Sequence, residues 1–392
     1  MFLKKIYSDM KKIFKSILLL TLAITLAGIY SSCTKNDTLP NNGEPLIRYV
    51  RSTNPLKSDS LLVGAFQGNL IAIIGENLGD AVEIWFNDQK AAITPTYITN
   101  TAIMVTIPST IPTVITSKLK IVFSNGKTLD YNFKVQISEP VIASMDCEYV
   151  LTDGIATIHG GYFYAPLTVT FVGGVKGELV SLTDKIIKVK VPAGAQPGRI
   201  TIHTNFGDTK SDFWFNDNRN IFISSDPYTG WWNSSFVVTS PAAGDPPSIN
   251  GNYIRVKKFI GGWGWVEAAG GPADAMGPIS KNIPDAAILK PSDYNLKFEV
   301  NTTKPYNGNN LVINAGLNSE YNNGYNWKPP YDTKGVWQTV VIPFNEIATG
   351  YDKPLTVNPN GYYTRLLFFG PGDLDCDMSF DNFRVVPKVL KK

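Results

Sequence analysis

Two stretches of this chain repeat each other in the same order, and the repeat limits the fold to a small set. The first begins with Glu-Pro-Leu-Ile at Glu44 and the second with Glu-Pro-Val-Ile at Glu139. In each, short runs rich in Val, Ile and Thr, such as residues 102–107 and 186–191, are separated by Gly, Asn, Asp and Pro. Each unit has about 80 to 95 residues and no long stretch with helical periodicity. This pattern predicts two antiparallel β-sandwiches whose alternate residues face inward.

Further matches between the two units identify the kind of sandwich. Both have a Gly after the second strand, a strand that ends in Pro at Pro108 and Pro192, a later strand that runs into an Asn- and Gly-containing turn, and an aromatic exit. This order resembles the IPT/TIG family of immunoglobulin-like domains. The resemblance implies one such domain in residues 44–138 and a second in residues 139–217.

Residues 218–392 do not repeat and have a different composition. They hold six of the eight tryptophans and 10 of the 18 tyrosines, with long loops rich in Gly, Asn and Tyr. Apolar runs bounded by these loops predict strands in residues 253–256, 294–300, 311–314, 337–342, 364–369 and 378–385. The pattern is typical of a jelly-roll-like β-sandwich, so the whole chain is predicted to be all-β.

The N-terminus has the pattern of an export signal. Basic residues precede a short apolar run at residues 17–27, which is shorter than the roughly 20 residues that span a bilayer. The Ser-Ser-Cys sequence ending at Cys33 resembles the lipobox of bacterial lipoproteins, in which the cysteine is lipidated. An ordinary secretory signal with an incidental cysteine is the alternative. We expect a lipoprotein signal peptide in residues 1–33, lipidation at Cys33, and a flexible tether in residues 34–43.

The small net charge and the small numbers of cysteines and histidines argue against several classes of function. The net charge is +3 over 392 residues, without a basic cluster beyond the signal, which argues against nucleic acid as a partner. Cys147 and Cys376 lie far apart in sequence and are expected to be buried free thiols. The two histidines, His159 and His203, both fall in the repeats. Histidine-based triads and histidine metal sites are therefore excluded from residues 218–392, and no cofactor is expected.

Trp263 and Trp265 stand among glycines between Gly261 and Gly271, with one charged residue beside them. On one strand, the two rings would point to the same face, about 7 Å apart. Aromatic rings on an exposed face stack against the C–H groups of a pyranose, so this spacing suits consecutive units of a polysaccharide. The flanking glycines favour exposure because they add no packing bulk and permit the close approach of a ligand. Burial of both rings in the core is the alternative.

Other aromatic residues are candidates for the same surface. One of Trp231 and Trp232 is expected to be free, because adjacent residues of an extended chain face opposite ways. Tyr325, Trp327 and Tyr331 lie in a segment between asparagines and prolines, where exposure and burial are both open. These five residues join the two tryptophans above as predicted ligand contacts.

Catalytic and metal-binding arrangements are weak in this sequence. Glu267 with Glu299 or Glu320 would be the carboxylate pair of a glycoside hydrolase, but acids are scattered throughout the segment. Four alternating aspartates between residues 373 and 381 would suit calcium, although such alternation is more often a solvated strand edge. We predict no catalytic residues and no metal site.

The export signal, the IPT/TIG-like repeats and the aromatic-rich C-terminal segment together resemble the surface glycan-binding proteins of starch-utilisation-system-like loci, of the SGBP-B type. The resemblance implies a non-catalytic outer-membrane lipoprotein at the cell surface, beside a TonB-dependent transporter and a surface glycoside hydrolase. It also implies polysaccharide contacts at Trp231 or Trp232, Trp263 and Trp265, with the IPT/TIG units as spacers. The near-neutral charge favours a neutral glycan of the β-glucan, xyloglucan or mannan type.

Two functions from other classes remain as alternatives. An adhesin would bind a host or matrix protein through residues 44–216. A surface glycosidase would need an essential carboxylate pair in the C-terminal segment.

Overall fold

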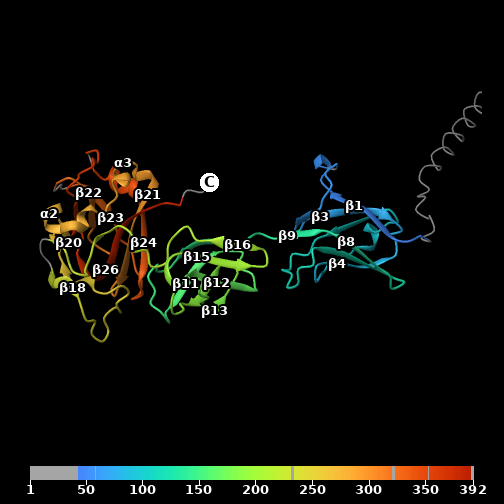
Figure 1. Ribbon diagram of the computed structural model, residues 1–392, viewed down its shortest axis with the longest axis horizontal. Coiled ribbons are helices and arrows are strands. Elements are labelled where there is room, and N and C mark those ends of the chain that lie inside the picture. Colours follow the sequence, from blue (N-terminus) through green and yellow to red (C-terminus); the bar gives the residue numbers. More distant parts are fainter. Residues whose placement is uncertain (1–42, 58, 231–233, 320–322, 352, 390–392) are drawn as a thin grey trace, which may run out of the picture. The chain divides into compact units, whose positions relative to one another are not determined.

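The computed structural model describes residues 43–389 except residues 58, 231–233, 320–322 and 352. The described chain forms two compact units, one that ends at Ile137 and one that begins at Ser138 (Figure 1). Most of the regular structure is β-sheet and the α-helices are short, which confirms the predicted all-β class. Within the described ranges, no helix combines the length and the apolar character needed to cross a membrane.

The first unit is a sandwich of two sheets, with strand orders β1-β3-β6 and β5-β4-β7-β8, and β2 and β9 form a parallel pair beside them. Along β7, Leu119, Ile121 and Phe123 are buried while the residues between them are more exposed. This period of two puts the apolar side chains of both sheets into one core. The elements are β1 (Leu46–Ser52), η1 (Pro55–Lys57), β2 (Gly64–Phe66), β3 (Leu70–Glu76), β4 (Ala81–Phe86), β5 (Gln89–Lys90), η2 (Pro95–Tyr97), β6 (Ala102–Thr106), β7 (Lys118–Phe123), β8 (Thr128–Asn132) and β9 (Lys134–Gln136).

The second unit begins with another sandwich, which we call the Ig-like part (residues 139–217). Its sheets have the orders β10-β11-β14-β13 and β12-β15-β16. The order β10-β11-β14 corresponds to β1-β3-β6, and β12-β15-β16 corresponds to β4-β7-β8, so the sequence repeat reappears as a repeat of topology. The strands are β10 (Val141–Met145), β11 (Ile155–Gly161), β12 (Leu167–Val172), β13 (Glu178–Leu182), β14 (Ile186–Lys190), β15 (Gln196–Thr204) and β16 (Gly207–Lys210).

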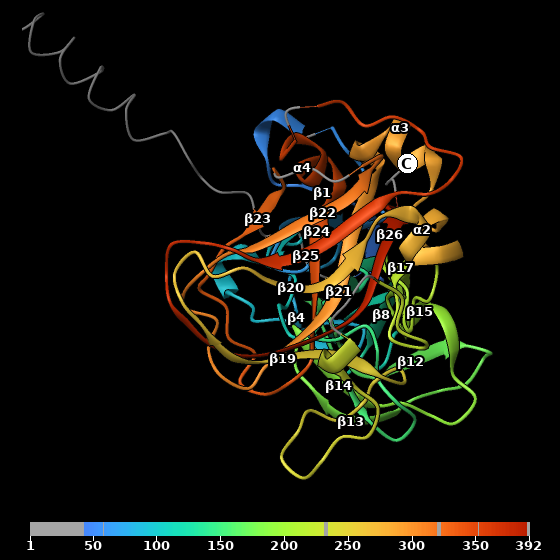
Figure 2. The same ribbon diagram turned by 90° about the vertical axis from the view of Figure 1, so that its left-hand side faces the viewer.

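The rest of the second unit, the C-terminal part, is a larger sandwich of two sheets (Figure 2). Its buried side chains form a hydrophobic core of their own. One sheet has the order β18-β19-β26-β21-β24, with β17 also paired to β26, and the other has the order β20-β25-β22-β23. The strands are β17 (Ile221–Ile223), β18 (Val237–Val238), β19 (Tyr253–Ile260), β20 (Val266–Gly271), β21 (Tyr294–Thr302), β22 (Leu311–Leu317), β23 (Tyr325–Trp327), β24 (Gln338–Pro343), β25 (Tyr363–Phe368) and β26 (Leu374–Pro387). The helices are η3 (Ser234–Phe236), α2 (Ala273–Met276), η4 (Gly277–Lys281), α3 (Asp285–Leu289), η5 (Pro291–Asp293) and α4 (Phe344–Thr349).

All six strands predicted in this part from the sequence are present, as β19, β21, β22, β24, β25 and β26. The longest is β26, with 14 residues, and it is buried along almost its whole length because β19, β21 and β17 all pair with it. The short helices were not predicted, since each is too short to show a helical period in the sequence.

Four charged side chains are buried where the Ig-like part meets the C-terminal part. Glu148, which follows β10, accepts hydrogen bonds from Lys297 Nζ of β21 at 2.6 Å and from Arg384 of β26 at 2.7 Å. Arg384 also donates to both carboxylate oxygens of Glu299, at 2.8 and 3.0 Å. None of the four residues is more than 6% exposed. We call these four residues the joint cluster; its ions bond to one another across the boundary between the two parts.

A buried group of aromatic side chains touches the joint cluster through Tyr149. Cys147, Tyr149, Tyr253 and Trp337 form one buried group, and the ring centroids of Tyr253 and Trp337 are 5.5 Å apart. The Tyr149 ring lies 5.2 Å from the guanidinium of the joint cluster. Cys147 and Cys376 are both buried free thiols, which confirms that prediction.

Candidate functional site

Trp263 and Trp265 lie in the loop of residues 261–265, which connects β19 of one sheet to β20 of the other. The two residues are 61% and 53% exposed. Both rings pack against the half-buried Phe369, at centroid distances of 5.2 and 5.5 Å. The two tryptophans are therefore together on the surface over a third ring, and the alternative of core burial is wrong. They do not share a strand, so the predicted strand geometry is also wrong.

One glycine beside these tryptophans, Gly262, serves the packing of one loop on another. The loop of residues 369–373, which joins β25 to β26, lies against the 261–265 loop, and the N–H of Gly262 donates to Asp373 Oδ1 at 2.7 Å. A Cβ at Gly262 would lie 2.5 Å from the carbonyl oxygen of Pro371. No side chain fits at that distance, so this glycine permits close contact between two loops rather than the approach of a ligand.

The backbone of Trp263 is in a conformation that costs free energy. Its φ is +60°, in the left-handed region that bulky side chains rarely adopt. The cost of that conformation is about 1–2 kcal/mol relative to glycine, which adopts it freely. The backbone conformation by itself would therefore favour glycine at this position. The tryptophan is therefore present in spite of its backbone conformation.

Two aromatic residues of this surface were missed by the sequence analysis. Phe369 lies against both tryptophans, and Phe259 of β19 is 63% exposed beside Gly261, whose Cβ position is 3.9 Å from the Phe259 Cε1. Part of a signal for Phe369 was present. It directly follows Phe368 at the end of a strand, and adjacent residues of a strand face opposite ways, so the two rings had to lie on opposite faces of the sheet. Every residue of β25 is buried, so alternation alone did not show that one of the rings would reach the surface.

Polar groups lie around the same rings. Asp373 and Asn307 are exposed. The loop that carries Asn307 is tied to the 369–373 loop, because Asn309 Nδ2 donates to the carbonyl oxygen of Gly372 at 3.1 Å. Amide and carboxylate groups donate to and accept from sugar hydroxyls, so the surface combines stacking rings with hydrogen-bonding side chains.

Trp231 and Trp232 lie outside the described residues. The segment before them is described, and Gly230 pairs with Gly270 of β20 through a parallel bridge. Tyr228 packs against the core, and burial, with the charge of nearby Glu267 as a second cause, raises the pKa of its hydroxyl to about 12. The segment up to Gly230 therefore reaches the β20 edge of the four-stranded sheet.

Tyr325, Trp327 and Tyr331 form a separate group at the opposite edge of that sheet, with β25 and β22 between. In β23, Tyr325 and Trp327 pair with the buried residues Ile313 and Leu311 of β22. All three aromatic residues are partly buried against the core, and the ring centroids of Trp327 and Tyr331 are 5.0 Å apart. Burial raises the pKa of both tyrosine hydroxyls. The structure thus groups these three residues with the core and apart from the 261–265 loop.

The glutamates considered for hydrolysis do not form a site in the described part of the chain. Glu299 is fully buried and bonded to Arg384, so its carboxylate cannot reach a glycan at the surface. Glu267 lies on β20, and Glu320 lies outside the described residues.

The alternating aspartates of residues 373–381 do not converge on one point either. Asp375 pairs with Lys304 at 2.6 Å, and Asp377 pairs with Arg255 at 2.7 Å. Among the described residues, no group of three or more His, Cys, Asp or Glu side chains is arranged to hold a metal ion.

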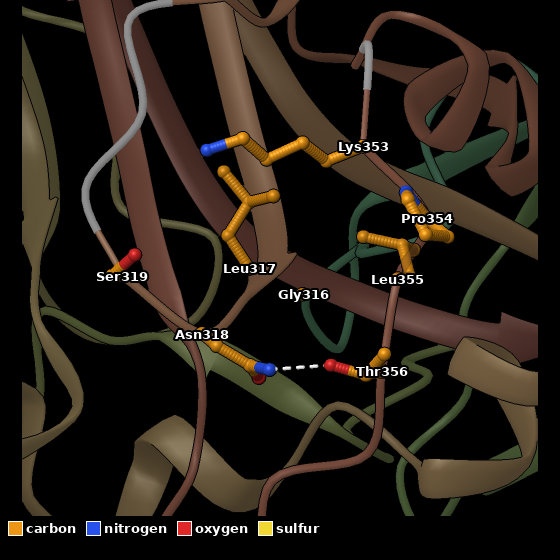
Figure 3. Close-up of a pocket in the computed structure, with 8 residues that line it drawn as sticks. All are labelled: Gly316, Leu317, Asn318, Ser319, Lys353, Pro354, Leu355 and Thr356. Atoms are coloured by element: carbon orange, nitrogen blue, oxygen red, sulfur yellow. Dashed lines mark hydrogen bonds between the residues drawn. The ribbon is translucent and has the colours of Figure 1, made fainter.

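A separate hollow of about 270 Å³ opens at the end of β22 (Figure 3). Its lining residues are Gly316, Leu317, Asn318, Ser319, Lys353, Pro354, Leu355 and Thr356. Asn318 Nδ2 donates to Thr356 Oγ1 at 2.5 Å across it. These lining residues include no aromatic ring, so the hollow lacks a surface on which a sugar could stack.

Two family models match the chain. Residues 215–387 match the surface glycan-binding protein B xyloglucan binding domain, and residues 60–136 match the IPT/TIG domain. An IPT/TIG domain-containing protein of Bacteroides ovatus (strain ATCC 8483) is 30% identical over 139 residues. That match covers 34% of this chain and 28% of the length of the relative.

Solved structures are similar over most of the chain. The surface glycan-binding protein PbSGBP-B from Prevotella bryantii is 23% identical, with a TM-score of 0.63 over 88% of this chain and 99% of that one, so the two share a fold. An SGBP-B from a complex xyloglucan utilization locus in Bacteroides uniformis is 17% identical, with a TM-score of 0.47 over 88% of this chain and all of that one. The chain is therefore similar to IPT/TIG domains over residues 60–136 and to the surface glycan-binding protein B xyloglucan binding domain over residues 215–387.

Proposed function

We propose that this chain binds a neutral polysaccharide, without cleaving it, at the surface formed by Trp263, Trp265, Phe369 and Phe259. The observation that carries the proposal is the exposed Trp263, held in a left-handed conformation next to a second exposed tryptophan. The match of residues 215–387 to a xyloglucan-binding family supports a glycan as the ligand. Xyloglucan is the first ligand to test, followed by other β-glucans and mannans.

The energetics of stacking suit such a surface. A ring that covers about 50–80 Å² of sugar contributes roughly 1–2 kcal/mol at about 25 cal/mol per Å². Two or three rings then give a dissociation constant from roughly millimolar to tens of micromolar, after the costs of ordering. We include Trp231 or Trp232 as a further ring. We assign Tyr325, Trp327 and Tyr331 to the fold, because they pack on the core.

Cleavage is not part of the proposal. Both histidines lie in the repeats and not at this surface, and the carboxylate of Glu299 is fully buried inside the protein. The family matches and the fold relative are named for glycan binding or for IPT/TIG domains, not for an enzymatic activity.

Affinity electrophoresis with a panel of polysaccharides tests this function. We expect a neutral glycan (xyloglucan, mixed-linkage β-glucan or mannan) to retard the protein, and the acidic polymer polygalacturonate to leave it unretarded. Incubation of the protein with the retarding glycan should release no oligosaccharides. Binding to polygalacturonate alone, or to none of the neutral glycans, would contradict the proposal, and released sugars would make the protein an enzyme.

We further propose that the protein is anchored at the cell surface by lipid on Cys33, which lies outside the described residues, beside a TonB-dependent transporter and a surface glycoside hydrolase. The Ser-Ser-Cys sequence after the apolar run supports the anchor. Lipoprotein cysteines carry more than one acyl chain, and at least two are needed for stable membrane binding.

Cys33→Ala is therefore expected to abolish labelling of the protein by a fatty-acid analogue. The variant should either be released from the membrane or remain unprocessed. Fractionation of cells that express either variant measures this. Cys33→Ala protein that is labelled and retained like the parent would rule out the anchor.

A further inference from the structure

A small hollow in the C-terminal part has an oxygen-rich wall. Its volume is about 220 Å³, and residues of β17 and β26 contribute to its lining. Its polar side chains come from Asp226, Asp381, Asn250, Asn382, Ser224 and Ser225. Its lining residues include two aspartates and neither Lys nor Arg. Negative charge and neutral oxygen atoms therefore dominate the surface of this hollow.

Asp381 is the buried side chain of this wall. It is 6% exposed, and its Oδ1 accepts the N–H of Asn382 at 2.8 Å. Its Oδ2 is buried and has no hydrogen-bond partner within the described residues. A buried carboxylate oxygen without a partner is costly, and native structures rarely contain one. Its position at the wall indicates a partner that the hollow itself would hold.

Neighbouring charges do not neutralise Asp381. Its register partner on β21 is Glu299, whose oxygens already bind Arg384. The joint cluster and Asp381 together contain three carboxylates and only two cationic groups. Asp226 adds a further carboxylate to the lining, and the hydrogen bonds that it accepts, at 2.9 and 3.1 Å, come from the neutral N–H of Asn252. Negative charge is therefore in excess at the hollow.

The two asparagines of the wall provide another oxygen. Asn250 Nδ2 donates to Asn382 Oδ1, while Asn382 Nδ2 is buried without a partner. Turning both amides by 180° keeps a hydrogen bond between them and places the Asn382 oxygen where the unpartnered nitrogen was. In that orientation, the wall exposes amide and carboxylate oxygens and no unpaired donor from Asn382.

We propose that this hollow binds a Ca²⁺ ion through Asp381 and Asp226, with Asn382 and water among the remaining ligands. Ca²⁺ takes about 6–8 oxygen ligands and tolerates irregular geometry, whereas Mg²⁺ requires a near-ideal octahedron. The hollow is large enough for the ion and several waters, at about 30 Å³ for each water. The ion ties the segment from Asp226 to Gly230, which reaches β20, to the central strand β26.

Thermal unfolding of the purified protein, first in EDTA and then in CaCl₂, tests the site. Surface modules bind Ca²⁺ with dissociation constants of about 0.1–1 mM. At about 10 mM CaCl₂, we expect the Tm of the second unit to rise by about 3–8 °C. An unchanged Tm would mean that a proton, and not Ca²⁺, neutralises Asp381. A larger rise with MgCl₂ than with CaCl₂ would overturn the choice of ion.

Two variants separate a ligand from a merely structural side chain. Asp381→Asn should lose the Ca²⁺-dependent rise and, in EDTA, melt no lower than the parent, because it removes an uncompensated buried charge. Asp226→Asn should also lose the rise, and it decides the matter if Asp381→Asn does not fold. Asp274→Asn, at an exposed aspartate of the same part, should keep the full rise. A full rise in both Asp226→Asn and Asp381→Asn would overturn the site.

Discussion

Replacing Arg384 by methionine is expected to lower the free energy of unfolding of the second unit by about 3–5 kcal/mol. Arg384 donates to Glu148 and Glu299, and none of the three residues is more than 3% exposed. Methionine fills similar space but leaves two buried carboxylates without their main cationic partner. Urea denaturation followed by tryptophan fluorescence measures the effect, because seven of the eight tryptophans belong to the second unit.

Lys190→Met is the matched control for this substitution. Lys190 pairs with Asp153 at 2.8 Å, but the two side chains are 40% and 75% exposed. A pair in solvent contributes only about 0–1 kcal/mol, so this variant should unfold almost like the parent. If the two variants lost the same free energy of unfolding, the joint cluster would contribute no more to stability than a surface ion pair does.

The combination of Trp263→Gly and Trp265→Ala is expected to weaken polysaccharide binding by at least about 25-fold, below detection in affinity electrophoresis. Each ring contributes roughly 1–2 kcal/mol, which corresponds to about 5- to 30-fold in affinity. Glycine is chosen at position 263 because the backbone there has a φ of +60°. Relief of that strain offsets the lost contact with Phe369, so the free energy of unfolding should change by less than about 1 kcal/mol.

Trp327→Ala is the control with the opposite expected result. Its ring packs against Phe298, Tyr306 and Tyr331 at centroid distances of 5.0–5.5 Å. Its loss should cost about 2–4 kcal/mol of stability, somewhat below a fully buried tryptophan, and leave the affinity of the folded protein nearly unchanged. The glycan would instead lie at the β23 edge if the combined Trp263→Gly and Trp265→Ala variant bound it normally. A Trp327→Ala variant that is stable and does not bind would lead to the same conclusion.

Much of the fold could be predicted because its signals are local. Buried and exposed residues alternate along β7 and along its counterpart in the repeat, and neighbouring residues in the sequence show this pattern. The exposure of two tryptophans among glycines could likewise be predicted from residues next to them in the sequence. The position of Trp327 could not be predicted. In a strand of three residues, alternation fixes which side chains share a face but not which face meets the core.

The joint cluster could not be predicted either, because Glu148 and Arg384 are 236 residues apart and each looks like an ordinary surface charge in sequence. A division after residue 217, as the repeats indicate, would leave Glu148 on one side and three charged residues on the other. Residues 138–392 form one compact unit, and the joint cluster bonds its two parts to each other.

The joint cluster also has a mechanical consequence. A protein that holds a long polymer is pulled whenever the polymer is drawn away. Tension applied at the 261–265 loop reaches the Ig-like part through the peptide chain near residues 216–220 and through Glu148, which bonds to both Lys297 and Arg384. Separating the two parts would remove both of these cationic partners from Glu148. The cluster therefore shares the load with the peptide connection and with the buried group of Cys147, Tyr149, Tyr253 and Trp337.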